Sequence, residues 1–314
     1  MYHMYSIRIP RLFQMRPAKQ PRLQSSSCVQ GGSSATTRVP LLSAEKDGYT
    51  LHPCTLHRRY KRFLGDVSFG NDETVVVVHV PNTGPMTGLL DHLPSRALVS
   101  ASSNPKRKYK HTLEWMMDDH GTWVGVHSAK ANAMVASLLD TQVLKDALPI
   151  PYTRYNREVS LAMKKKMHTT DAGDGEKRSR KRKNESSSRI DFELIDDVSG
   201  KTCLVEVKSV TMMIEDEKYG KVAVFPDTKS ERAQRHVQEL TDVVKNKDAE
   251  AALIFLIQRG DCKSFSPCFE KDPEYAALVA EAVQAGVKIV PVVVDLVVNQ
   301  VQFSGMIPYM ERSS

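Results

Sequence analysis

The chain has 314 residues, enough to bury a full core and to divide into two domains, and this length excludes a peptide or a minimal scaffold. Its formal net charge is +7, but residues 1–44 contain six Lys or Arg and no acid, and residues 164–185 contain nine against four acids. Removing the +6 and +5 of these segments leaves about −4 for the remainder, so the overall charge is weak support for DNA binding by the folded part.

Neither the apolar segments nor the cysteines indicate a membrane span or a disulfide scaffold. The longest apolar run, KIVPVVVDLVV, includes a proline and an aspartate and is shorter than the ~20 residues that span a bilayer. We therefore expect a soluble protein without a membrane partner. The five cysteines form no CxxC pair, which favours a reducing compartment.

The first residues are rich in Arg and Ser, free of acids and contain scattered apolar residues, as organelle presequences do. Pro10 and Pro17 interrupt a long amphipathic helix, and a disordered basic arm is the alternative. We predict a mitochondrial targeting segment, with nuclear or cytoplasmic localisation as the alternative. Residues 1–46 are accordingly predicted to be a disordered extension outside the fold.

Residues 47–123 contain short strand-like segments separated by turn signals. The segments are RYKRFLGDVSF, TVVVVHV, RALVSAS and KYKHTLEWMM, with the turn-rich PNTGPMTGLL between the second and the third. Short strands at this spacing are typical of a small barrel or sandwich. We therefore predict an all-β first domain.

Residues 124–314 are predicted to form an α/β domain. ANAMVASLLDTQVL, residues 131–144, has apolar side chains at helical spacing, and the following REVSLAM is strand-like. The hydrophilic run at 163–188 is too polar to bury and is predicted to be a disordered basic insert between two strands. Its KRSRKRK segment is consistent with a nuclear localisation signal, a phosphate-binding arm or a segment that only increases solubility.

The rest of this domain has well-marked elements. RIDFELI and TCLVEVKSV predict a hairpin, a helix follows over about 230–245, and AALIFLI and VKIVPVVVDL predict strands. Between those strands, Asp272 can cap a helix, Pro273 suits its first turn and Gly286 can end it. The order of helix, three strands, helix, strand, helix and strand predicts an α/β sandwich around a mixed sheet.

The predicted hairpin brings two acids and a lysine together. If its turn is centred on Val198 and Ser199, Asp191 lies opposite Glu206, where Cβ atoms on one face are about 4.5 to 5.5 Å apart. Lys208, two residues beyond, projects from the same face. A shift of one residue in register would separate these side chains across the sheet.

This group has two interpretations. Adjacent carboxylates repel unless a cation or a proton lies between them, and Asp191 and Glu206 offer the oxygen ligands that suit Mg²⁺ or Mn²⁺. Such an ion, with Lys208 holding the attacking water or the intermediate, would promote phosphodiester hydrolysis. Alternatively, the E-x-K alternation is the solvent-facing side of an ordinary hairpin.

Several long segments match a known family. They are RRYKRFLGDV, HVPNTGPMTGLL, VGVHSAKAN, RIDFELI, CLVEVKSVTM, FPDTKSERAQRHVQEL and DPEYAALVAEAVQAGVKIV. In these segments the chain resembles the sugar fermentation stimulation protein family, SfsA. The resemblance implies an N-terminal OB-like barrel followed by a PD-(D/E)XK nuclease-like α/β domain with a mixed sheet, and an activity of non-specific DNA binding. The N-terminal extension and the basic insert depart from the family pattern.

The resemblance also implies roles for particular residues. Asp191, Glu206 and Lys208 fall on the nuclease signature, with the two acids as metal ligands. Glu158, in the preceding strand, is similar to the family's additional acid, and His236 lies in its helix motif. We therefore take Asp191, Glu206, Lys208 and Glu158 as the candidate catalytic residues.

Basic and polar residues outside the hairpin are the predicted DNA contacts. RRYKRF interleaves basic and aromatic residues, as surfaces that track single strands do, and an exposed basic strand is an equal alternative. PNTGPMTG lacks the ending of a nucleotide-binding P-loop, and a tight structural loop is favoured over one that touches phosphates. The predicted contacts are Arg58, Arg59, Lys61, Arg62, Asn82, Thr83, Arg232 and His236.

The sequence thus predicts a DNA-binding protein with a Mg²⁺- or Mn²⁺-dependent nuclease domain and no strong sequence preference. The alternative is a non-catalytic DNA-binding or regulatory protein that has the same fold but does not cleave DNA. An assembly protein without nucleic acid is the least favoured, and homo-oligomerisation stays open.

Overall fold

The structure is a computed structural model that describes residues 39–43, 48–72, 74–161, 188–297 and 300–311. The predicted targeting segment up to residue 38 and residues 163–187 of the predicted insert lie outside this part of the chain. Ser188, at the end of that insert prediction, is described, and its hydroxyl donates a 2.6 Å hydrogen bond to Glu239 Oε1. Among the described residues, no helix is long and apolar enough to cross a bilayer.

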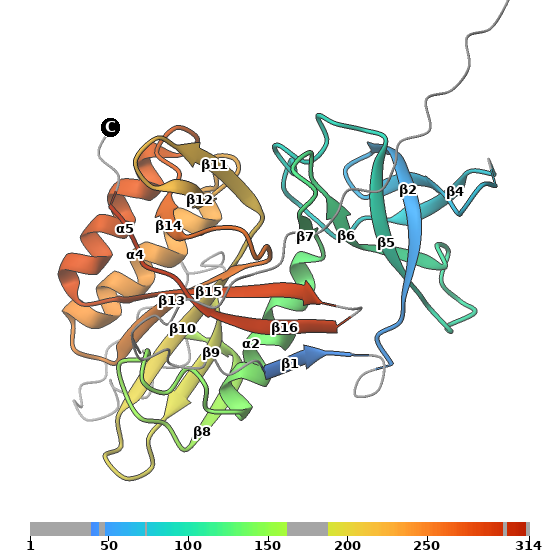
Figure 1. Ribbon diagram of the computed structural model, residues 1–314. Coiled ribbons are helices and arrows are strands. Elements are labelled where there is room, and N and C mark those ends of the chain that lie inside the picture. The colour runs from blue at the N-terminus through green and yellow to red at the C-terminus, as the bar shows by residue number, and fades with distance from the viewer. Residues whose placement is uncertain (1–38, 44–47, 73, 162–187, 298–299, 312–314) are drawn as a thin grey trace, which may run out of the picture. The chain divides into compact units, whose positions relative to one another are not determined.

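The N-terminal part folds into a six-stranded sheet that closes on itself (Figure 1). Its strands are β2 Leu51–Tyr60, β3 Leu64–Ser68, β4 Val76–His79, β5 Ser95–Ala101, β6 His111–Met117 and β7 Trp123–Gly125. The order is β4-β3-β2-β5-β6-β7, and a further pairing of β4 with β6 closes the ring. Leu56, Val67 and Val99 are among the side chains that fill the interior. The predicted OB-like barrel is confirmed.

One strand-like segment of this part is two strands. RYKRFLGDVSF was expected to be a single strand, but the chain turns within it between β2 and β3. Lys61 and Arg62 have left-handed φ values of 46° and 66°, which are uncommon for residues other than glycine. The RRYKRF motif therefore ends in a turn and does not form a continuous basic strand.

The second part is built on a seven-stranded mixed sheet. Its strands, in order across the sheet, are β1 Val39–Leu42, β16 Gln300–Met306, β15 Lys288–Val297, β13 Glu250–Ile257, β10 Thr202–Val210, β9 Arg189–Ile195 and β8 Arg154–Ser160. β10, β13 and β15 run parallel, and the outer strands pair antiparallel. This arrangement confirms the predicted α/β class with a mixed sheet.

Helices cover both faces of the mixed sheet (Figure 1). They are α2 Ala131–Asp140, preceded by the 3₁₀ helix η1 Ser128–Lys130, and α4 Glu231–Lys245 and α5 Pro273–Ala285. The buried side of α2 shares a core with Val205 of β10, whereas α4 and α5 share the opposite core with Leu204. Because strand residues alternate between faces, Glu206 faces the α4 layer, as Leu204 does.

The capping residues set the helix ends. Ser230 caps α4 by accepting a hydrogen bond from Ala233 N at 3.2 Å, and Asp272 caps α5 by accepting one from Tyr275 N at 3.0 Å. Gly286, with φ of 106°, ends α5. The predicted limits of both helices are confirmed. The first helix is shorter than predicted, ending at Asp140 and not at residue 144.

Several strands were not predicted. β11 Met212–Asp216, β12 Gly220–Phe225 and β14 Ser264–Pro267 form a separate three-stranded sheet, and β16 and β1 extend the large one. β1 corrects the prediction that residues 1–46 are disordered, because it pairs with β16 and its Leu41 is only 1% exposed. A four-residue strand owes its stability to a partner remote in sequence, so local composition does not reveal it.

Asp272 links the N-termini of α4 and α5. It is fully buried, its Oδ2 accepts a hydrogen bond from Ser230 N at 3.0 Å, and its Oδ1 accepts from Tyr275 N and from Gln234 Nε2 at 2.8 Å. We expect Asp272→Ala to lower the free energy of unfolding by about 3 kcal/mol, because a cap is lost and buried donors lose their acceptor. Urea denaturation followed by circular dichroism measures this loss.

The matched control is Asp242→Ala, which removes an exposed acid from α4. Its effect should stay within about 0.5 kcal/mol. Equal stability of the two variants would show that Asp272 does not hold the helix ends.

Candidate active site

β9 and β10 pair in the predicted register. The ladder joins residues 202–205 to residues 195–192 in antiparallel order, as a turn at Val198 and Ser199 requires. Beyond this ladder the Asp191 carboxylate contacts β10 directly, and its Oδ2 accepts a hydrogen bond from Val207 N at 2.8 Å. The side chain of Asp191 is therefore tied to the backbone immediately after Glu206.

Glu206 is held at one oxygen by two donors. Its Oε1 accepts a hydrogen bond from Lys208 Nζ at 2.6 Å and another from His236 Nδ1, on α4, at 2.5 Å. The residue is 4% exposed, and its Oε2 is buried without a hydrogen-bond partner in the described part of the chain. A buried acceptor without a donor is costly, so Oε2 marks a position suited to a further ligand.

The two acids have opposite pKa shifts. Burial, followed by the nearby charge of Glu206, raises the pKa of Asp191. Burial alone would also raise the pKa of Glu206, but the charge of Lys208 and the hydrogen bond from His236 outweigh burial and lower it. Pairs of carboxylates whose surroundings separate their pKa values are typical of functional sites.

Asn132 belongs to the site, although the sequence did not single it out. Its Nδ2 donates a 2.6 Å hydrogen bond to Asp191 Oδ1, so Asn132 and Val207 N fix both oxygens of this acid. Asn132 lies in the first turn of α2. A polar residue at the start of a largely apolar helix was the available signal, and it is a weak one.

The acid pair fits a divalent cation that needs few protein ligands. Asp191 and Glu206 supply hard oxygen donors, and Glu206 Oε2 accepts no hydrogen bond from the described residues. Across the described residues, no group of three or more His, Cys, Asp or Glu side chains gathers in a way that could hold a metal. Mg²⁺ commonly binds through one or two carboxylates together with water and phosphate oxygens.

Glu158 lies on β8, and its side chain is exposed. Its φ is 52°, a left-handed value, and its carboxylate is 3.6 Å from Arg189 Nη1. The neighbouring strand β9 carries both Arg189 and Asp191. The ion pair with Arg189 is a surface contact, so the role of Glu158 as an additional acid stays a prediction.

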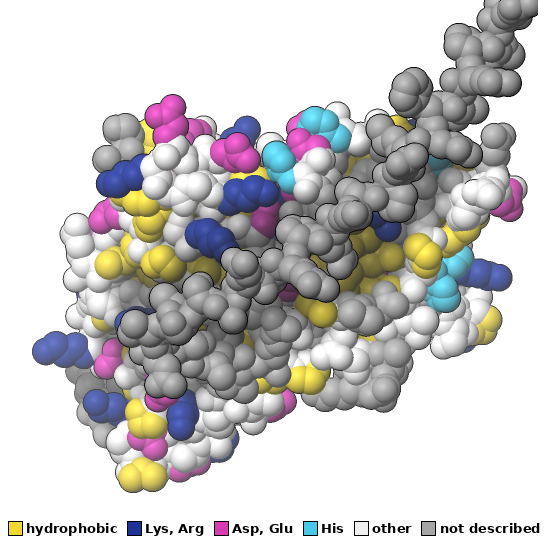
Figure 2. All heavy atoms as spheres, viewed as in Figure 1, with side chains coloured by type: hydrophobic (Ala, Val, Ile, Leu, Met, Phe, Trp, Pro, Cys, Tyr) yellow, Lys and Arg dark blue, Asp and Glu magenta, His cyan; other side chains and the backbone are white. Residues whose placement is uncertain are grey.

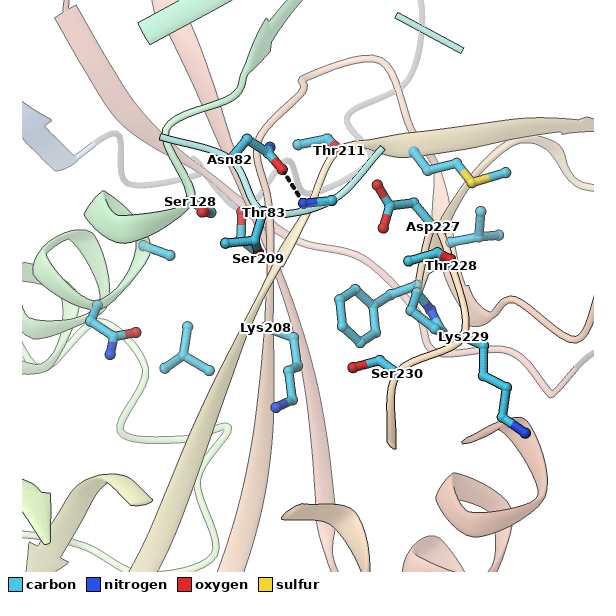
Figure 3. Close-up of a pocket in the computed structure, with 18 of the residues that line it drawn as sticks. Asn82, Thr83, Ser128, Lys208, Ser209, Thr211, Asp227, Thr228, Lys229 and Ser230 are labelled. Atoms are coloured by element: carbon cyan, nitrogen blue, oxygen red, sulfur yellow. Dashed lines mark hydrogen bonds between the residues drawn. The ribbon is translucent and has the colours of Figure 1, made fainter. Parts of the chain in front are cut away.

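A cavity of about 370 Å³ is lined by Lys208, Val207 and Asn132, residues that donate hydrogen bonds to the acid pair (Figure 3). Lys208 lies in the middle of the view, on the strand that runs beneath the cavity, with Asn82 and Thr83 above it and Ser230 beside it. The walls thus come from the loop after β4, from β10 and from the segment that leads into α4. Both structural parts contribute side chains to this cavity.

Two of the predicted DNA contacts hold the loop after β4 in place. Arg59 donates to the carbonyl oxygens of Arg62, Asn82 and Gly84 at 2.6 to 3.0 Å. Asn82 is buried, donates to Val126 O at 3.0 Å and accepts from Gly84 N. These contacts give Arg59 a structural role that the sequence did not indicate, whereas the contacts of Asn82 fit the tight structural loop that the sequence favoured.

The other predicted contacts differ in accessibility. Arg62 and Thr83 are exposed and line the cavity, with Arg62 Nε donating to Thr83 O at 3.0 Å. His236, predicted as a DNA contact, is only 3% exposed and bonded to Glu206, so its side chain is used to position that acid. Three more predicted contacts are accessible to solvent: Arg58, Lys61 and Arg232.

Lys and Arg side chains do not gather into one patch on the face shown in Figure 2. They alternate there with acidic side chains over the described residues. This distribution agrees with the charge of about −4 that remains outside the two basic segments. Any nucleic-acid contact by the described residues of this face therefore depends on individual side chains and not on a broad positive field.

Comparisons with known proteins cover both parts of the chain. Residues 58–126 match the model of the SfsA N-terminal OB domain, and residues 130–300 match that of the sugar fermentation stimulation protein RE domain. The sugar fermentation stimulation protein homolog of Crocosphaera subtropica is 35% identical over 256 residues, which is 82% of this chain and 93% of the homolog. That of Synechocystis is 37% identical over 251 residues, or 80% and 92%.

A solved structure supports the fold. The structure of Pyrococcus furiosus SfsA in complex with Ca²⁺ aligns with a TM-score of 0.66 at 21% identity, covering 87% of this chain and 99% of that one. At this identity the likeness concerns the fold, and the family assignment comes from the sequence matches. The chain belongs to the sugar fermentation stimulation protein family, SfsA.

Proposed function

We propose that this protein binds DNA without strong sequence preference and hydrolyses its phosphodiester bonds with the aid of a divalent metal. The observation that supports this most is the acid pair itself. Glu206 is buried and Asp191 half-buried, Lys208 is bonded to Glu206 and lines the cavity, and Glu206 Oε2 has no hydrogen-bond partner among the described residues. Carboxylates beside a lysine are a suitable arrangement for phosphoryl chemistry.

Asp191 and Glu206 would hold the ion, Mg²⁺ or Mn²⁺. When bound, such an ion neutralises charge on a phosphate and lowers the pKa of a water. The solved relative from Pyrococcus furiosus is a Ca²⁺ complex, which supports a divalent site in this fold.

The protein's own residues orient the reacting groups. His236 and Lys208 both donate to Glu206 Oε1, so the carboxylate is fixed in its charged form with Oε2 left for a ligand. Asn132 and Val207 N fix the orientation of Asp191 by donating one hydrogen bond to each of its oxygens. Lys208, which also lines the cavity, can donate a proton of its ammonium group to a phosphate oxygen or hold the attacking water.

A second candidate function is DNA binding without cleavage. It is favoured by one observation, that both oxygens of Asp191 already accept hydrogen bonds from the protein. In that case the acid pair would stabilise the hairpin end and the cavity alone would contact DNA. Cleavage assays separate the two functions.

We expect Asp191→Asn and Glu206→Gln each to lower the rate of DNA cleavage at least about 100-fold in Mg²⁺ or Mn²⁺, because each removes a charge needed by the ion and the phosphate. The assay follows labelled single-stranded and duplex oligonucleotides. DNA binding, measured by fluorescence anisotropy, should persist in both variants.

The control is Asp197→Asn, which removes an exposed acid from the turn of the same hairpin, where it pairs with Arg154. Its cleavage rate should match that of the unmodified protein. Cleavage by Asp191→Asn at that rate would rule out the nuclease proposal.

Metal binding has a readout that does not need activity. A ligand that binds only the folded state stabilises it, by about 2.7 kcal/mol at a hundred times its dissociation constant. We expect Mn²⁺ to raise the melting temperature of the unmodified protein and of Glu215→Gln, an exposed acid on β11, but not that of Glu206→Gln. An equal rise in Glu206→Gln would place the ion elsewhere.

A further inference from the structure

The cavity beside Lys208 is walled by the loop after β4, and this loop is held rigidly. Arg59 ties its carbonyl oxygens together, and Met86 N donates to Asp227 Oδ2 at 3.3 Å. A Cβ on Gly84 would lie 2.6 Å from Asp227 Oδ2, so loop and carboxylate are in close approach. The wall is therefore a fixed feature of the fold and limits what can reach the acid pair from this side.

The size of the cavity sets the first limit on its ligand. With about 370 Å³, it would be about 9 Å across if it were spherical. The major groove of a DNA duplex alone is about 12 Å wide, so the cavity cannot enclose a duplex. Pockets of roughly 300 to 1,000 Å³ enclose small organic molecules, and a single nucleotide is a ligand of that size.

The lining sets the second limit. The charged side chains of the wall are three cations and one carboxylate, and hydroxyl groups lie among them: Arg62, Lys208, Lys229, Asp227, Thr83, Thr228 and Ser230. Ser230 is also the N-cap of α4, so the positive end of that helix borders the cavity. Cations and hydroxyl donors together suit a phosphate and a sugar.

Apolar side chains lie in the same wall. Met212, Phe225 and Pro226 line the cavity together with Val207 and Val224. Phe225 is the aromatic side chain among them, and an aromatic ring beside positive charge suits an unpaired base and its phosphate, since base stacking contributes most when the base is not paired. In a duplex the base faces are already stacked on each other and are not available.

We propose that this cavity holds one unpaired nucleotide next to the phosphate at Asp191 and Glu206, so that the substrate is single-stranded DNA and not an intact duplex. The assignment of the neighbouring phosphate rests on the proposed nuclease function. The binding preference for an unpaired strand does not rest on the nuclease function, because it follows from the size and the lining of the cavity.

The test measures anisotropy of a labelled 12-nucleotide single strand and of the blunt duplex of the same sequence, without metal. We expect the unmodified protein to bind the single strand at least about tenfold more tightly. Arg62→Asn should weaken single-strand binding about three- to tenfold, leave duplex binding nearly unchanged, and reduce the salt dependence of single-strand binding by about 0.7 of a log unit per log unit of salt.

Lys61→Asn is the matched variant. It removes the same charge from the same turn, again at a left-handed residue for which Asn is suited, but Lys61 does not line the cavity. We expect it to weaken single-strand and duplex binding equally and by less. An equal loss in both variants, or duplex binding as tight as single-strand binding, would overturn the inference.

The same oligonucleotides with Mg²⁺ or Mn²⁺ distinguish this inference from the proposed function. If neither substrate is cleaved, the nuclease proposal is contradicted. The relative affinity for single strand and duplex, measured by anisotropy, still tests whether the cavity holds an unpaired nucleotide. Cleavage of the duplex at the single-strand rate supports the nuclease and contradicts the unpaired nucleotide.

Discussion

The buried carboxylate of Glu206 is the constraint on which the candidate site depends. Taking a carboxylate out of water is costly unless opposite charge and donors compensate, and here Lys208 and His236 provide both. Because both donate to Oε1, the other oxygen is buried with no hydrogen-bond partner among the residues that the structure describes. His236 lies on α4, so its hydrogen bond to Glu206 makes that helix part of the site. The charge of Glu206 also lies close enough to Asp191 to raise the pKa of Asp191.

Local patterns predicted the parts of the structure that local interactions determine. The turn at Val198 and Ser199 fixed the hairpin register and hence the meeting of Asp191 with β10, because a two-residue period leaves little freedom once the turn is set. The limits of α4 and α5 followed from Ser230, Asp272 and Gly286, whose capping contacts lie within one turn of the helix.

Features that depend on distant parts of the chain were not predictable in this way. β1 exists because β16, far along the sequence, offers it an edge. Arg59 and His236 were both predicted to contact DNA, but carbonyl groups of the loop after β4 accept the hydrogen bonds of Arg59, and His236 is hydrogen-bonded to Glu206. In each case the outcome depends on a partner that is distant in sequence. For Arg59 and His236, that partner accepts the hydrogen bonds that the side chain could otherwise offer to DNA.

The central claim is that Asp191 and Glu206 share a divalent ion, with Oε2 of Glu206 as one of its ligands. Anomalous diffraction from crystals soaked in Mn²⁺ tests this most directly. The account predicts an anomalous peak in contact with both carboxylates, and its absence from crystals of Glu206→Gln. Mn²⁺ bound only at other positions, at a concentration that saturates the protein in solution, would contradict it.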